Sequence, residues 1–156
     1  MDNHEKALEV FNGLCKTFEK YDWQYEKEEA KLTLRSGAVS ADLPMEFDVI
    51  VEEDSMLVLL VSRLPFSVPE DRRRDMAVAV SVANNALADG CFDFDICGGR
   101  LFFRMTSCFL DSTLGEDLFR YMLFASCRII DEYNDKFLSL ATGRMPVEEF
   151  IEKCRR

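Results

Sequence analysis

Two stretches of alternating apolar residues flank the glycine pair Gly98 and Gly99, and this segment constrains the fold more than any other. The apolar positions recur at every second residue: Phe92, Phe94, Ile96, Leu101, Phe103 and Met105. A two-glycine loop suits the turns with positive φ that match the twist of paired strands. We therefore predict an antiparallel hairpin that pairs Ile96 with Leu101, Phe94 with Phe103 and Phe92 with Met105. The same register places Asp93 opposite Arg104 on the other, solvated face.

The start of the chain has the periodicity of a helix followed by a strand. Apolar residues recur at steps of three and four at Leu8, Phe11, Cys15 and Phe18. This stripe predicts an amphipathic helix over residues 3–21. Residues 22–29 have no clear period, whereas residues 31–35 alternate and predict a short strand that ends at Ser36 and Gly37.

A second hairpin is predicted between residues 45 and 61. Residues 45–52 alternate, and an almost wholly apolar run at residues 56–61 follows a polar turn, which is typical of a central strand. The outer face of this strand pair carries four apolar residues, Ile50, Leu57, Leu59 and Val61. Large exposed apolar patches mark binding surfaces. Either the N-terminal helix covers this patch or a second copy of the chain does, in a two-fold contact, and we favour the second copy.

Three further helices are indicated by capping signals at the pair Ser67 and Glu70, at the pair Thr113 and Glu116, and at Pro146. A Ser or Thr three residues before a Glu satisfies backbone N–H groups at a helix start, and proline is favoured in the first turn. The first of these helices is expected to end near Gly90. The second is the longest element and ends at Gly143, and the third is a short terminal helix.

The order of elements, α-β-β-β-α-β-β-α with a short terminal helix, indicates an α+β fold. Antiparallel hairpins, rather than strand-helix-strand alternation, predict a five-stranded antiparallel sheet with helices packed mainly on one face. No linker, internal repeat or low-complexity tract divides the 156 residues. We therefore expect a single domain over residues 1–156.

Charge and cysteine usage exclude several classes of protein. A net charge of −10 repels phosphate backbones and anionic lipid heads, so neither nucleic acid nor a membrane is an expected partner. The longest apolar run, residues 56–61, is too short to span a bilayer, and no signal peptide follows Met1, so we expect a cytoplasmic protein. Six cysteines without a C-x-x-C pair favour reduced thiols over a disulfide framework or a zinc site.

The residues that could carry chemistry favour structural roles. His4 is the single histidine and lies near the terminus, so a Ser-His or Cys-His arrangement has no positioned base. Asp93 and Asp95 share one strand face with Cys91 and Cys97, but side chains at i and i+2 stand about 7 Å apart along a strand. We therefore predict no catalytic residue, no cofactor and no metal site.

Three segments together resemble known proteins. They are the helix over 72–87 with Asn84 and Asn85, the hairpin CFDFDICGGRLFFRM, and the helix that begins TLGEDLF and ends LATG. The order of elements resembles the type III secretion chaperone fold. Residues 65–143 resemble the YbjN family of bacterial proteins, described as sensory transduction regulators. This resemblance implies a non-enzymatic protein that dimerises or holds a segment of a partner, and it supplies no functional residues.

Three hypotheses follow from the sequence. The first is a homodimeric, chaperone-like or regulatory adaptor that uses Ile50, Leu57, Leu59 and Val61 and binds an unidentified protein partner. The second is a sensor with a small-molecule pocket between the long helix and the sheet, lined by Phe119 and Tyr133. The third is a small hydrolase or transferase that uses Asp93 and Asp95 with a divalent ion.

Overall fold

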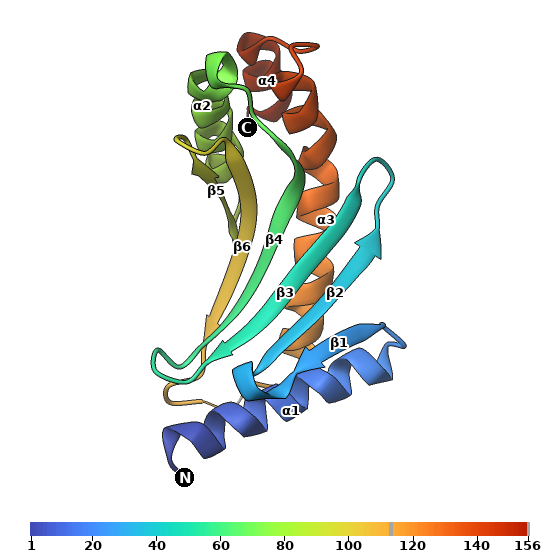
Figure 1. Cartoon of the computed structure of the whole chain (residues 1–156), viewed down its shortest axis with the longest axis vertical. Coiled ribbons are helices and arrows are strands. Elements are labelled where there is room, and N and C mark those ends of the chain that lie inside the picture. Colours follow the sequence, from blue (N-terminus) through green and yellow to red (C-terminus); the bar gives the residue numbers. More distant parts are fainter. Residues whose placement is uncertain (113, 156) are drawn as a thin grey trace.

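A computed structural model, which describes residues 1–112 and 114–155, contains an antiparallel sheet with helices on one side (Figure 1). Its six strands follow the spatial order β1-β2-β3-β4-β6-β5. The strands are β1 (Tyr25–Glu28), β2 (Thr33–Val39), β3 (Pro44–Glu52), β4 (Leu57–Ser67), β5 (Cys91–Asp95) and β6 (Arg100–Cys108). The helices are α1 (Asn3–Lys20), α2 (Arg73–Ala86), α3 (Glu116–Ala141) and α4 (Val147–Cys154), with short 3-10 turns η1 (Glu29–Lys31) and η2 (Glu70–Arg72).

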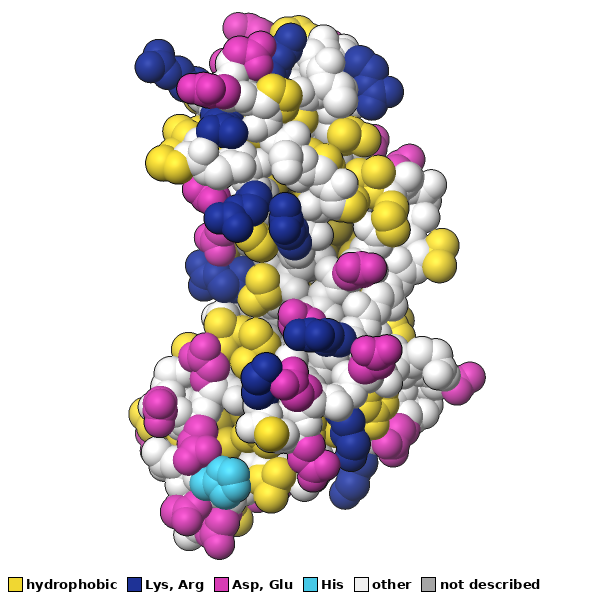
Figure 2. Space-filling view, in the orientation of Figure 1, with side chains coloured by type: hydrophobic (Ala, Val, Ile, Leu, Met, Phe, Trp, Pro, Cys, Tyr) yellow, Lys and Arg dark blue, Asp and Glu magenta, His cyan; other side chains and the backbone are white. Residues whose placement is uncertain are grey.

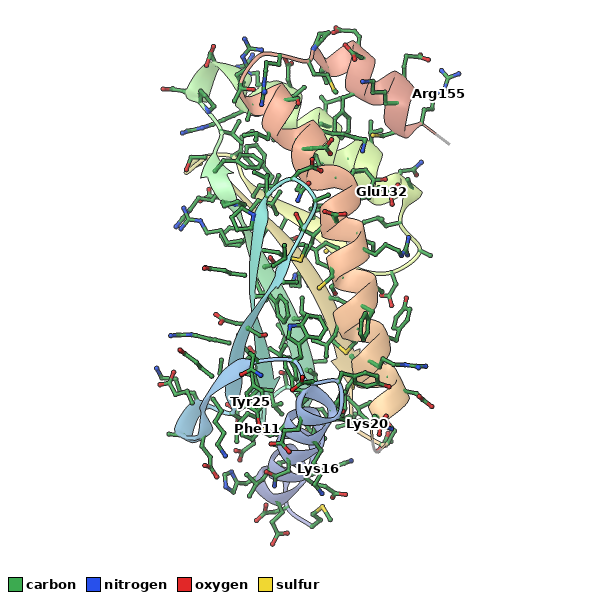
Figure 3. The ribbon with its side chains drawn as sticks, turned by 90° about the vertical axis from the view of Figure 1, so that its right-hand side faces the viewer. Phe11, Lys16, Lys20, Tyr25, Glu132 and Arg155 are labelled. Atoms are coloured by element: carbon green, nitrogen blue, oxygen red, sulfur yellow. The ribbon has the colours of Figure 1, made fainter. Side chains whose placement is uncertain are left out.

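The helices cover one face of the sheet, as the sequence predicted. Helix α3 runs behind the sheet in Figure 1, with α1 beside its lower half and α2 and α4 at its upper end. Figure 2 shows the opposite, uncovered face in the same orientation. In Figure 3, turned by 90°, α3 lies to the right of the strands, while side chains alone project to the left along most of the sheet. The α+β class and the one-sided helical layer are confirmed.

The core lies between the sheet and this helical layer. Strand β3 alternates strictly between its two faces, and its inner residues are Met45, Phe47, Val49 and Val51, all buried. At the upper end Phe137 of α3 contacts the rings of Phe92 and Phe150. Apolar residues of α1, α2 and α3 therefore meet one apolar face of the sheet, and α4 packs on α2 and α3, which is the pattern expected for a two-layer domain.

The sheet has six strands, not the five predicted. The missed strand is β1, whose four residues are exposed or half-exposed and show no alternation. Strand β2 also extends beyond the predicted end, through Gly37 to Val39. Only glycine fits at position 37, because the backbone of β3 approaches closely and a Cβ there would lie 2.6 Å from the carbonyl oxygen of Met45. The indole of Trp23, two residues before β1, donates to the Gly37 carbonyl at 2.8 Å and holds this segment against β2.

The predicted helix start at Ser67 and Glu70 is wrong. Strand β4 continues to Ser67, Glu70 begins the turn η2, and α2 starts at Arg73 without a side-chain cap. Helix α2 also ends at Ala86, before Gly90. The second predicted capping pair includes Thr113, which lies outside the described residues. The N-cap of α3 is Gly115, which has no side chain to cap the helix, and Glu116 is the first helical residue.

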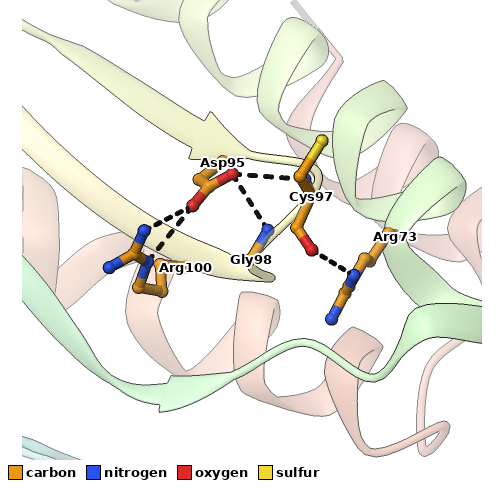
Figure 4. Close-up of polar contacts among 5 residues, drawn as sticks. All are labelled: Arg73, Asp95, Cys97, Gly98 and Arg100. Atoms are coloured by element: carbon orange, nitrogen blue, oxygen red, sulfur yellow. Dashed lines mark hydrogen bonds and ion pairs between the residues drawn. The ribbon is translucent and has the colours of Figure 1, made fainter.

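The predicted register of the β5–β6 hairpin is wrong by two residues. Phe92 pairs with Phe103 and Phe94 with Leu101, and residues 96–99 form the loop. The Asp95 carboxylate accepts the backbone N–H groups of Cys97 and Gly98 at 3.2 and 2.9 Å, and this stabilises a four-residue turn. Figure 4 shows these bonds. A shift of two residues preserves the strand faces, so Asp93 and Arg104 remain on the outer face.

The six cysteines differ in accessibility, and this predicts an order of reactivity. Cys97 and Cys108 are exposed, whereas Cys15 and Cys154 are buried. Burial raises the pKa of the Cys127 thiol to about 11, which depletes its reactive thiolate at neutral pH. We expect a short iodoacetamide pulse on the native protein to label Cys97, which lies in the β5–β6 loop, first, as read by peptide mass spectrometry. In urea all six should react alike, and rapid native labelling of Cys127 would contradict the packing of α3.

Candidate interaction surface

The four apolar residues of the predicted patch lie together on the uncovered face of the sheet. Ile50 pairs directly with Leu59 across β3 and β4, and Leu57 and Val61 follow at two-residue steps on either side of Leu59. All four side chains are only partly buried in the chain. Their location on the outer face is therefore as predicted, while their contact with a partner stays a prediction.

Helix α1 does not cover this patch. It contacts α3 and β3, and its buried residues Phe11, Leu14 and Phe18 belong to the common core on the other side of the sheet. A Cβ placed on Gly13 of α1 would lie 3.2 Å from the ring of Phe119 in α3, so the two helices pack closely. Within the described part of the chain, the outer patch has no helix over it. Of the two alternatives raised by the sequence, intramolecular cover by the N-terminal helix is excluded.

Charged side chains surround the patch in an asymmetric pattern. The half made by β4, β6 and β5 carries Arg63, Arg100, Arg104, Asp93 and Asp95, and the half made by β1, β2 and β3 carries Glu26, Glu28, Arg35, Glu46, Asp48 and Glu52. Figure 2 shows Lys and Arg side chains gathered over the upper parts of β4 and β6. One half of the face is therefore rich in arginine and the other is acidic.

Ion pairs within the chain neutralise only some of these charges. Arg104 binds Asp93 at 2.7 Å, Arg100 binds Asp95 at 2.8 Å, and Arg35 lies 3.4 Å from Asp48. Three exposed side chains, Arg63, Glu26 and Glu46, form no ion pair or side-chain hydrogen bond with the described residues. The unmatched cation lies on the arginine-rich half and the unmatched anions lie on the acidic half.

These unmatched charges line a hollow of about 1090 Å³ on the same face. Its walls include Glu26, Arg35, Glu46, Asp48, Val61 and Arg63, so it joins the apolar patch at Val61. The hollow therefore combines apolar side chains, such as Val61 and Phe66, with charges of opposite sign. Such a surface is suited to binding a protein segment, because apolar burial supplies affinity and the charges fix orientation.

The aspartates considered as metal ligands are engaged within the hairpin. Asp93 binds Arg104 and accepts a hydrogen bond from the Cys91 thiol at 3.7 Å. Asp95 holds the turn, and the backbone N–H of Gly98, followed by the Arg100 guanidinium, lowers the pKa of its carboxyl (Figure 4). Among residues 1–112 and 114–155, no group of three His, Cys, Asp or Glu side chains is placed to hold an ion. The geometry therefore favours a structural role for both carboxylates.

The other candidate residues also have structural surroundings. His4 lies in the first turn of α1, and its ring is 2.9 Å from Glu53 in the β3–β4 turn, which raises the pKa of the imidazole. Phe119 and Tyr133, named for a pocket between α3 and the sheet, are buried core residues at 1 % and 4 % exposure. Their positions are filled by core packing and give no support to a ligand pocket there.

The two edges of the sheet are poorly suited to pairing with another strand. On β5, the Asn84 side chain of α2 accepts the N–H of Phe92 at 2.8 Å and donates to its carbonyl oxygen at 2.9 Å. On β1, the sequence Glu26-Lys27-Glu28 faces solvent, and a two-fold pairing centred on it would place a charged residue opposite its own copy. Charged edges and capped backbone groups discourage strand addition.

Comparison with known proteins agrees with this architecture. No protein-family model matches the sequence, and neither does any curated protein. The crystal structure of YbjN from E. coli, described there as a proposed transcription regulator, superposes with a TM-score of 0.59 at 12% identity, over 80% of this chain and 91% of that one. The fold is YbjN-like. The structure of the ExsC-ExsE complex matches with a TM-score of 0.54 at 12% identity, over 85% of this chain and 96% of that one, so the YbjN-like fold is also type III secretion chaperone-like.

Sequence reasoning identified the patch but missed residues that define its surroundings. Arg63, Glu46 and Glu26 were not singled out, because their significance depends on which strands are neighbours. Asn84 was noted as part of the YbjN resemblance, but no signal in the sequence indicated that it caps β5.

None of the helices in residues 1–112 and 114–155 has the length and hydrophobicity needed to cross a bilayer.

Proposed function

We propose that this chain is a non-enzymatic, chaperone-like or regulatory adaptor that acts as a homodimer in the bacterial cytoplasm. The observation that carries the proposal is the apolar patch of Ile50, Leu57, Leu59 and Val61, which the chain leaves uncovered on a sheet with all its helices on the other side. A second copy of the chain would remove these side chains from water, as a two-fold contact does for a self-complementary surface.

Two further observations support a protein partner for the homodimer. The uncovered face combines apolar side chains with unmatched charges of both signs, which suits a protein surface better than nucleic acid or an anionic membrane. ExsC, whose fold is similar, was solved in complex with ExsE, so this fold accommodates a protein partner there. The partner of the present chain is to be identified by affinity capture from its native host.

The homodimer is tested by replacing Leu59 with Asp. Leu59 lies at the centre of the patch opposite Ile50, so the substitution places an unpaired carboxylate in the contact of both copies. We expect dissociation to increase by about a hundredfold or more, since each 1.4 kcal/mol changes the equilibrium tenfold. The measurement is molecular mass by light scattering and sedimentation equilibrium over a wide range of concentration.

Val39→Asp is the matched control for this experiment. Val39 is fully exposed at the end of β2, outside the patch, so an aspartate introduced there should leave the dimer intact. Circular dichroism checks that both variants stay folded. A wild-type chain that stays monomeric at every working concentration would overturn the homodimer.

A further inference from the structure

The arrangement of the two copies follows from the distribution of charge on the uncovered face. This inference rests on the proposed homodimer and specifies its geometry. The sheet has three strands on each side of the boundary between β3 and β4, in the order β1-β2-β3 and β4-β6-β5. The unmatched cation Arg63 lies on one side of this boundary and the unmatched anions Glu26 and Glu46 lie on the other. The boundary therefore divides the face into halves of opposite character.

Pairing of sheet edges is the first alternative, and the structure disfavours it. The outward N–H and C=O groups of Phe92 on β5 are already bound by Asn84. The β1 edge would bring like charges together in a two-fold pairing. The contact is therefore made face to face, where the apolar patch lies.

A face-to-face contact has its two-fold axis between the sheets, and the direction of that axis decides which halves meet. An axis across the strands places each strand of one copy on the same strand of the other copy, so the acidic half meets the acidic half. An axis along the strands exchanges the two halves, so the acidic half of each copy meets the arginine-rich half of the other. Like-charge contact at an interface is costly, whereas opposite potentials favour association.

We propose that two copies of the chain bind face to face about a two-fold axis that runs along the strands between β3 and β4. Strand β3 of each copy then lies on β4 of the other, with strand directions roughly aligned, as in sandwiches of two twisted sheets. Ile50 and Leu59 are direct cross-strand partners, so Ile50 of each copy packs on Leu59 of the other.

The same geometry gives Arg63 a specific counter-charge. Asp48 pairs with Val61, and Glu46 and Arg63 lie two residues further along these strands, at the same level of the sheet. The Ser62 hydroxyl donates to the Glu46 carbonyl oxygen at 2.6 Å, which confirms that β3 and β4 are still adjacent there. Exchange of β3 and β4 by the axis therefore places Arg63 of each copy against Glu46 of the other.

Mixing two charge-reversal variants tests this arrangement. In the Arg63→Glu homodimer, a glutamate at position 63 faces Glu46 of the second copy, and in the Glu46→Lys homodimer a lysine faces Arg63. We expect each variant alone to dimerise about tenfold or more weakly than wild type, because like charges meet twice. In the mixture, both contacts join opposite charges, so a heterodimer should form with near wild-type affinity. Native mass spectrometry of the mixture, with one variant isotope-labelled and the other unlabelled, measures the fraction of heterodimer.

The outcomes separate this inference from the homodimer itself. Both side chains are exposed and form no ion pair or side-chain hydrogen bond with the described residues, so the variants should melt like wild type. A wild-type dimer whose variants associate normally, or whose variants fail to form the mixed dimer, overturns the axis along the strands and leaves the homodimer in place. Stronger association of Glu46→Lys alone would indicate the axis across the strands. A monomeric wild type would remove both proposals.

Discussion

Replacing Phe137 with Ala is expected to lower the free energy of unfolding by about 3–5 kcal/mol. Phe137 is fully buried in α3, and its ring lies 4.9 Å from Phe92 of β5 and 5.3 Å from Phe150 of α4. Loss of this ring removes contacts of α3 with β5 and with α4 and leaves a cavity in the core. Urea denaturation followed by circular dichroism, at one fixed protein concentration, measures the change.

Phe124→Ala provides the matched control on the same helix. Phe124 is 51 % exposed and contacts Tyr21 and Trp23 at ring distances of 5.8 and 5.5 Å. A truncation that leaves no closed cavity should cost only about 1 kcal/mol. Equal losses for the two variants would show that Phe137 is not the centre of the upper core.

The strands that were predicted from the sequence are those whose faces differ most strongly. In β3 the inner residues are apolar and the outer residues are mostly acidic, so the alternation of side chains alone assigns Ile50 to the outer face. The same alternation places Leu57, Leu59 and Val61 on the outer face of β4. The candidate patch could therefore be found without coordinates, because a strand alternates its side chains with a period of two.

Strand β1 could not be found in this way. Its four residues are too few for a period, and three of them are charged. Its place is fixed by pairing with residues 33–36 of β2, and the Trp23 indole just before it also bonds to Gly37 of that strand. Short strands of this kind are specified by tertiary structure and not by local propensity.

The β5–β6 turn shows a different limit of sequence reasoning. The pair Gly98 and Gly99 favoured a two-residue turn, but only Gly99 has a positive φ, of 70°. The Asp95 side chain selects the longer loop by accepting two backbone N–H groups. The ion pair of Asp93 with Arg104 forms in spite of the changed register, because diagonal neighbours on one face remain within reach.

The start of α2 was misplaced because spacing does not show whether a capping pair is used. Ser67 and Glu70 have the spacing of a capping box, yet Ser67 still pairs with Arg100 in the sheet. Arg73 instead anchors this region by donating to the carbonyl oxygens of Val68 and Cys97 at 3.2 and 2.5 Å. Those contacts join segments far apart in the sequence.

The two halves of the interaction surface depend on strand order, which a single sequence does not reveal. Strand β6 inserts between β4 and β5, so Arg100 and Arg104 lie beside Arg63 although some forty residues separate them in the chain. The acidic half is built by three consecutive strands and is local. The charge asymmetry that orients the proposed dimer is therefore a property of topology.

Replacing Asn84 with Ala is expected to destabilise the fold and to open the β5 edge. The substitution removes both hydrogen bonds to Phe92, whose backbone groups lie within a nearly buried residue at 2 % exposure. Leaving one such group unsatisfied costs about 1–3 kcal/mol, so we expect a total loss of about 2–4 kcal/mol in urea denaturation. Asn85→Ala is the matched control, because Asn85 is exposed and next in sequence.

The Asn84→Ala variant also separates edge pairing from the proposed face-to-face contact. An uncapped β5 edge offers free N–H and C=O groups to another strand, so higher assemblies should form as concentration rises. Because β5 lies outside the patch, adding Leu59→Asp should abolish the discrete dimer but not the larger assemblies seen by light scattering. If Asn84→Ala is as stable and as monodisperse as Asn85→Ala, the side chain of Asn84 does not protect the edge, and pairing of two copies through β5 is no longer disfavoured.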